Sequence, residues 1–233
     1  MEWLRIWQQP ELGLFLATYA VCQYSRPPDL QHRLDSQRRR KSAPENVHTG
    51  KLNAVTTELD VLNRVSAGLT AQGLPFMLTG SFALAHYATP RMTRDIDIVV
   101  ALMVNDVGKL IQEFGNDFYV DADAARAAAQ SERLFNMMHF SSGIKIDLIV
   151  RKSSDYRMLE FERRQRATLG MVNTWIVSRE DLILSKLVWA RDAQSEIQRR
   201  DVKQLLGAVI DQDYLLYWAG ALGVQMLLKE LLP

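Results

Sequence analysis

The chain has 233 residues, of which 48% are hydrophobic, and its formal net charge is +1. This length fits one medium-sized domain with an appendage, and the near-neutral charge excludes a global basic excess of the kind that nucleic-acid-binding proteins carry. The single cysteine, Cys22, excludes an internal disulfide and is typical of a reducing compartment, so we expect a cytoplasmic protein.

The first 51 residues do not have the pattern of a folded domain. An apolar stretch from Leu12 to Cys22 is too short to span a bilayer and lacks a basic flank, so we expect no membrane partner. From Gln23 to Lys51 the chain is polar, with a basic run at Arg38–Lys41 that would contact RNA or simply stay solvated. We expect residues 1–51 to be disordered or a non-native extension.

A patterned fold begins at Leu52, where apolar residues recur at helical spacing as far as Ala71. A buried strand over 76–78 follows the Gly73-Leu74-Pro75 break. Further along, the pattern predicts helices over 82–87, 105–113 and 122–129, and strands over 95–101, 118–120, 134–140, 144–150 and 172–177. The basic segment Arg163-Arg164-Gln165-Arg166 is interpreted as a connector before the last strand. The alternation predicts an α/β core over 52–177 and a helical region over 178–233.

The most informative motif lies between the first two predicted strands. The strand that ends at Thr79 runs into Gly80-Ser81 and a short helix, and the next strand opens with Asp95-Ile96-Asp97. Side chains alternate along a strand, so Asp95 and Asp97 project from the same face. Two like charges so close are costly without a cation between them, and a Gly-Ser turn at a helix start accepts phosphate. The motif indicates a site for a nucleoside triphosphate and Mg²⁺.

A third carboxylate, Asp147, lies in the predicted strand over 144–150, on the face that also carries Lys145 and Ile149. An acid inside so apolar a strand needs a compensating partner, which favours a metal ligand. The alternative is an acid at a strand edge that faces solvent. Asn136, on the opposite strand of this predicted hairpin, is a candidate contact for the base.

Two basic residues, Arg94 and Lys186, each have two possible roles. Arg94 would bind phosphate or form a salt bridge with Asp95 or Asp97. In the helix that follows a capping pattern at Ser178, Lys186 lies within the inward apolar stripe. An inward ammonium either meets an anion or extends its stem so that the charge reaches water.

These motifs together resemble a known family. The order of a strand, Gly80-Ser81, a helix, the Asp-x-Asp strand, a later strand with Asp147 and then helices is similar to the nucleotidyltransferase superfamily typified by DNA polymerase beta. More narrowly, it resembles the AbiEii/MenT-type minimal nucleotidyltransferases, many of which are toxins of toxin–antitoxin pairs. The resemblance covers about residues 54–211 and implies a mixed twisted sheet flanked by helices, followed by a C-terminal helical region.

The resemblance implies a role for each site residue. Asp95 and Asp97 would bind Mg²⁺ or Mn²⁺, with two ions in all, and Asp147 would complete the second metal position and orient the attacking hydroxyl. The resemblance also implies that five residues bind the nucleotide: Gly80, Ser81, Arg94, Lys186 and Asp201. Lys186 would hold the triphosphate, and Asp201 would orient Lys186 or Arg200, unless it is simply an exposed helix acid.

The implied function is transfer of a nucleoside monophosphate from an NTP to an acceptor hydroxyl, with RNA such as tRNA as acceptor and a cognate antitoxin as partner. One alternative is a non-catalytic relative that binds nucleotide or a partner protein. Another is a small-molecule enzyme like the aminoglycoside nucleotidyltransferases. Retention of all three carboxylates favours catalysis, and Lys186 with Asp201 favours the toxin-like group.

Overall fold

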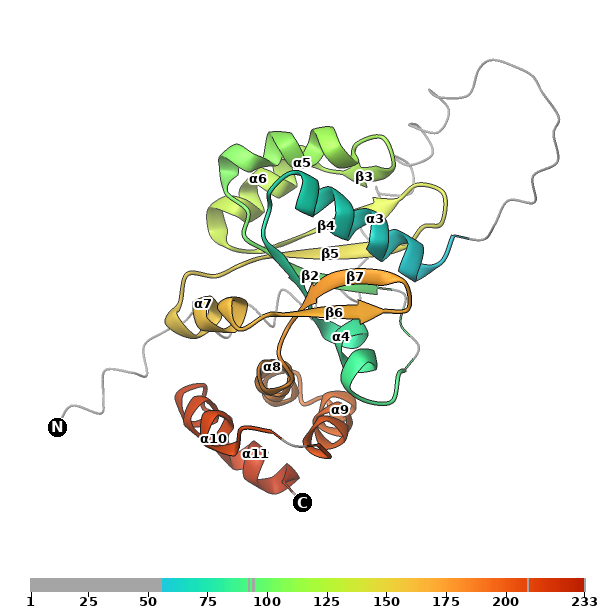
Figure 1. The fold of residues 1–233 in the computed structure, drawn as a ribbon. Helices are drawn as coiled ribbons and strands as arrows, with labels where there is room; N and C mark the ends of the chain where they lie inside the picture. The colour runs from blue at the N-terminus through green and yellow to red at the C-terminus, as the bar shows by residue number, and fades with distance from the viewer. Residues whose placement is uncertain (1–55, 92, 94, 209, 233) are drawn as a thin grey trace, which may run out of the picture.

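The computed structural model describes residues 56–91, 93, 95–208 and 210–232. The expectation for residues 1–51 and the phosphate role of Arg94 therefore lie outside the described residues. The described chain builds one mixed seven-stranded sheet with helices on both faces, and its last helices form a further layer beyond one face (Figure 1).

The sheet has the strand order β3-β4-β5-β2-β1-β7-β6. The strands are β1 (Phe76–Leu78), β2 (Asp95–Val100), β3 (Phe118–Val120), β4 (Leu134–His139), β5 (Lys145–Val150), β6 (Gln165–Leu169) and β7 (Val172–Ile176). The pairs β2–β5 and β1–β7 are parallel, and the other neighbouring pairs are antiparallel. This mixed, open sheet flanked by helices confirms the predicted fold class.

The helices are α3 (Glu58–Ala71), α4 (Gly80–Tyr87), α5 (Val107–Phe114), α6 (Ala122–Ser131), α7 (Asp155–Glu162), α8 (Arg179–Asp192), α9 (Glu196–Leu206), α10 (Gln212–Ala221) and α11 (Gln225–Leu231), with a 3₁₀ turn, η1 (Val104–Asp106), before α5. The helix predicted from Leu52 is described from Glu58, where a capping box between Thr57 and Asp60 starts it. No helix within the described ranges is both long and apolar enough to cross a membrane.

Two elements differ from the sequence prediction. Helix α7 was not predicted, because two of its inward positions are Arg157 and Glu160, which hide the apolar period and are buried as an ion pair at 2.8 Å. The presumed basic connector over 163–166 is wrong in its second half, since Gln165 and Arg166 begin β6. As the last strand of the described sheet, β6 is largely exposed and has no buried hydrophobic run to reveal it.

Alternation in β2 divides the sheet into a core face and a site face. Ile96 and Ile98 are fully buried on the face that α3 covers, together with Thr174 of β7, whose hydroxyl lies 3.1 Å from that of Ser66 in α3. Asp97 therefore points to the opposite face, against which α4 packs, with α8 beside α4. The hydrophobic core thus fixes the strand that carries the acidic motif.

Candidate functional site

The three predicted acids are brought together by the parallel pairing of β2 with β5. Its register places Asp97 opposite Asp147 and Asp95 opposite Lys145. Opposite residues of paired strands point to the same face, so all four side chains share one surface. Asp97 and Asp147 are 3% and 1% exposed, whereas Asp95 lies nearer the rim with a 37% exposed side chain. Two buried carboxylates thus lie side by side beneath a third.

The ammonium of Lys145 lies among these acids. Its Nζ is 3.0 Å from Oδ2 of Asp147 and 3.7 Å from Oδ2 of Asp95. Burial opposes its charge, but Asp147 and Asp95 outweigh this effect and raise the pKa of Lys145. No three Asp, Glu, His or Cys side chains of the described residues are gathered closely enough to ligate one ion together. The Lys145 ammonium therefore offsets part of the negative charge of Asp95 and Asp147.

One carboxylate oxygen of Asp147 has unused capacity. Burial, opposed by Lys145, raises the pKa of Asp147 to about 7. Its Oδ1 is buried and has no hydrogen-bond partner among the described residues, and the same holds for Oδ1 of Asn136, the residue opposite it in β4. Two acceptor oxygens without donors on one face are the arrangement that a bound cation satisfies. This observation fits the predicted metal site.

The Gly-Ser turn closes over Asp97. Gly80 has φ of +63°, and a Cβ added there would lie 1.9 Å from Oδ2 of Asp97, so only glycine fits. The backbone N–H of Thr79 donates to the carbonyl oxygen of Asp97 at 2.9 Å and ties the turn to β2. Ser81 follows in the first turn of α4, where helix N–H groups and the helix dipole favour an anion. The turn therefore places an anion-binding feature directly beside the acids.

Lys186 and Asp201 form a buried ion pair between α8 and α9. Nζ of Lys186 donates to Oδ2 of Asp201 at 2.7 Å and to Oε1 of Gln198 at 3.0 Å, and Nε of Arg91 lies 3.4 Å from the same carboxylate oxygen. Burial lowers the pKa of Lys186, while Asp201 opposes the shift. Lys186 and Asp201 are each 2% exposed, so a stem reaching water and an exposed helix acid are both wrong. Asp201 orients Lys186 and Arg91, and Arg200 is not its partner.

A cleft of ≈ 520 Å³ lies in front of the acids. It is lined by Ser81, Arg91, Thr93, Asp95, Asp97, Trp189, Ala193, Ser195, Ile197 and Gln198. One wall is therefore acidic and polar, and the other is partly apolar. Lys186 does not line this cleft but borders a smaller cavity of ≈ 60 Å³ that shares Trp189 with it and reaches Gly80. Lys145, Gln198 and Trp189 belong to the site although no motif singled them out.

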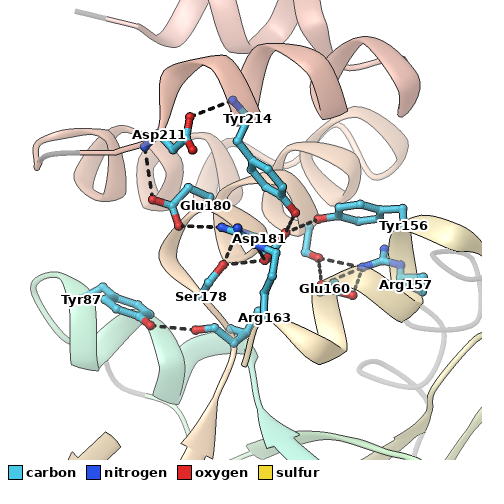
Figure 2. A network of polar contacts seen from close by, with 12 residues as sticks. Tyr87, Tyr156, Arg157, Glu160, Arg163, Ser178, Glu180, Asp181, Asp211 and Tyr214 are labelled. Atoms are coloured by element: carbon cyan, nitrogen blue, oxygen red, sulfur yellow. Dashed lines mark hydrogen bonds and ion pairs between the residues drawn. The ribbon is translucent and has the colours of Figure 1, made fainter. Parts of the chain in front are cut away.

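A second polar cluster lies away from the cleft, at the start of α8 (Figure 2). The fully buried carboxylate of Asp181 accepts hydrogen bonds from Ser178 Oγ at 2.5 Å, Tyr214 Oη at 2.6 Å and Arg163 Nε at 3.0 Å. The Ser178 hydroxyl in turn accepts from the Asp181 N–H, which confirms the predicted cap. These contacts lock α10 and the segment before β6 onto α8.

Known proteins resemble the chain in structure but not detectably in sequence. No protein-family model matches it, and neither does any curated protein. An antigenic nucleotidyltransferase-like protein from Paracoccidioides brasiliensis superposes with a TM-score of 0.52 at 17% identity, over 73% of this chain and 86% of that one. The enzyme ANT(2'')-Ia, in complex with adenylyl-2''-tobramycin, superposes with a TM-score of 0.51 at 13% identity, over 73% and 99%. The chain therefore has a nucleotidyltransferase fold.

Proposed function

We propose that this chain is a divalent-cation-dependent nucleotidyltransferase, which moves a nucleoside monophosphate from an NTP to an acceptor hydroxyl. The observation that carries the proposal is the β2–β5 register, which aligns Asp97 with Asp147 on the face that borders the cleft. The cleft has room for a nucleotide. The nucleotidyltransferase fold agrees with this assignment.

In the proposed site, Asp95, Asp97 and Asp147 would hold two cations between them, Mg²⁺ or Mn²⁺, rather than ligate a single ion together. When bound, the cations would neutralise the triphosphate and stabilise the attacking and leaving oxygens of an in-line displacement. Asp147 contributes the oxygen that lacks a donor, and Lys145 must then move away from Asp147 to free the second oxygen. No side-chain nucleophile is required, because phosphoryl-type transfer needs mainly positioning and charge neutralisation.

The triphosphate would lie on the turn that carries Gly80 and Ser81. The Ser81 hydroxyl and the first N–H groups of α4 would donate to phosphate oxygens, and Gly80 permits their close approach. Arg91, which lines the cleft and is held by Asp201, would supply a cation to the outer phosphates. Lys186 would add a second positive charge near the triphosphate, and Arg94 would also bind phosphate.

The acceptor that we propose is an RNA hydroxyl, as the toxin-like pairing of Lys186 with Asp201 suggests, and a cognate antitoxin would then be the regulatory partner. A small-molecule hydroxyl is the second candidate, because ANT(2'')-Ia, which has the same fold, was solved with an adenylylated aminoglycoside. A non-catalytic nucleotide-binding relative is the third.

A transfer assay separates these candidates. The full chain is incubated with each labelled NTP, Mg²⁺ and either total RNA or an aminoglycoside, beside an Asp97→Asn control. Label on RNA that is lost in the control supports the proposal, and label on the aminoglycoside alone supports the second candidate. NTP binding without any transfer would mean that the chain is a non-catalytic relative.

A further inference from the structure

Three arginines and two aromatic rings alternate from the end of β5, past α7, to β6 and β7. Arg151 Cζ lies 5.2 Å from the ring centre of Phe161, and Arg164 Cζ lies 4.4 Å from the same centre. Arg164 is also 5.1 Å from the ring centre of Trp175, and Arg166 is 4.2 Å from it. These distances are within the range of cation–π attraction. We call these five residues the arginine–aromatic row.

The row lies on the site face of the sheet but outside the cleft. Arg166 is opposite Trp175 in the β6–β7 register, and Thr174 faces α3, so Trp175 and Arg166 face the other side. Arg151 follows β5, four residues beyond Asp147, which corresponds to about 13 Å along a strand. The residues that line the cleft include none of the row. The row is therefore separate from the cleft.

The positive charges of this row are only partly compensated, since Glu162 attracts Arg164 but the neighbouring Arg151 opposes its charge. Within the described ranges, no carboxylate forms an ion pair with Arg151, Arg164 or Arg166, and Nε of Arg151 and of Arg164 is buried without a hydrogen-bond partner. Other arginines of the fold do have such partners, for example Arg64 with Glu113 and Arg126 with Asp123. Neighbouring guanidinium groups without ion-paired carboxylates repel one another and retain unused donors, which favours binding of an anion.

We propose that the arginine–aromatic row binds single-stranded RNA. Phe161 is buried and anchors the row, whereas the partly exposed ring of Trp175, with the guanidinium groups of Arg164 and Arg166 over it, offers phosphate donors beside planar groups on which bases can stack. A lone phosphate would instead be held by donors that converge in a pocket. Thr168, exposed and two residues beyond Arg166 in β6, adds a polar group on the same face. Binding here goes beyond the proposed function, because it requires no transfer.

Fluorescence anisotropy with a short labelled oligoadenylate RNA tests the proposal on the full chain in EDTA. Arg166→Gln removes the exposed charge and should reduce the slope of log affinity against log salt by about 0.7, the value for one phosphate contact to a single strand. Trp175→Leu keeps apolar bulk but removes the ring, and should weaken binding about tenfold. Arg126→Gln, an exposed arginine on α6, is the matched control and should change neither quantity.

Two results would overturn the proposal. One is an Arg166→Gln protein whose salt slope and affinity equal those of Arg126→Gln, with both melting temperatures unchanged. The other is polyglutamate displacing the RNA as well as unlabelled RNA of equal charge does. Binding is also measured on Asp97→Asn, so that RNA binding without transfer would refute only the proposed function, and transfer without row-dependent binding would refute only this inference.

Discussion

The chain buries carboxylates in two clusters that differ in how completely they are satisfied. Asp181 receives hydrogen bonds from a hydroxyl, a phenol and a guanidinium that belong to different elements (Figure 2). Asp147, equally buried, has one ammonium contact and one oxygen with no donor among the described residues. A buried carboxylate that accepts hydrogen bonds from several elements holds those elements together. A buried carboxylate with an oxygen that lacks a donor is suited to binding a ligand. The burial of an acid therefore says little about its role until its partners are counted.

The largest expected effects come from removing one acid of each cluster. Asp97→Asn should lower transfer at least about a hundredfold, because fixed charge at the reacting phosphate is lost, while the melting temperature holds or rises. Asp181→Ala should instead cost about 3 kcal/mol of unfolding free energy, since it strands the donors of Ser178, Arg163 and Tyr214. Activity assays and urea denaturation of both variants measure the contrast. Equal loss of stability in both would remove the distinction.

Gly80 provides a sharper test, because a matched glycine exists. Gly80 and Gly143 both have positive φ, +63° and +70°, so alanine costs about 1 kcal/mol of strain at either position. Only at Gly80 does the added Cβ meet Asp97, whereas at Gly143 it meets no atom of the described chain within 4 Å. Gly80→Ala should therefore lose NTP binding and transfer, and Gly143→Ala should keep both. Isothermal titration with an NTP and Mg²⁺ measures the affinity. Equal NTP affinity of the two variants would contradict the role of Gly80 beside Asp97.

A smaller, ten- to hundredfold loss of NTP affinity is expected for Lys186→Met, the value of a charge-assisted hydrogen bond of about 1.5–3 kcal/mol. The same change leaves the buried carboxylate of Asp201 with Arg91 as its ion-pair partner among the described residues, at 3.4 Å, so stability should also fall. The double variant Lys186→Met/Asp201→Asn should recover stability but not affinity. Recovery of affinity as well would show that the pair is structural, like the Asp181 cluster.

The pH dependence of stability is the most modest prediction. In the folded chain without metal, the pKa of Asp147 is about 7, compared with an ordinary value of 3.8. The folded state then holds a proton that the unfolded state releases, so this group makes stability fall as pH rises from 3.8 to about 7. Asp147→Asn should flatten that part of the profile. Urea denaturation in EDTA at several pH values measures it, and an unchanged profile would mean that Asp147 is not protonated.

The sequence predicted the elements that follow simple periodicity. The strand over 118–120 and the face alternation of the Asp-x-Asp strand agree with the structure, because their buried runs are apolar. Helix α7 could not be predicted from periodicity, since its buried positions include Arg157 and Glu160. These two residues pair within the helix, but they are buried against α8, where both contact Ser185. The same reason applies to β6, an exposed edge strand whose partner must be known before it can be recognised.

In the site, alternation placed Lys145 and Asp147 on one face, but not the contact between their charges. That contact depends on the parallel register of β5 with β2, which is set by elements that lie between them in sequence. The pairing of Lys186 with Asp201 likewise depends on how α9 folds back against α8. The motifs located the acids of the candidate site, and the structure supplied their charge partners.

Calorimetric titration of the full chain with Mn²⁺ tests most directly whether the acids of β2 and β5 hold a cation. The parent should bind Mn²⁺, and Asp97→Asn should not. Lys145→Met should bind more tightly than the parent, because the ammonium that competes for Asp147 is gone. Asp181→Asn is the matched control in the satisfied cluster and should bind as the parent does. Mn²⁺ binding that is the same in the parent, Asp97→Asn and Lys145→Met would contradict the proposed metal site.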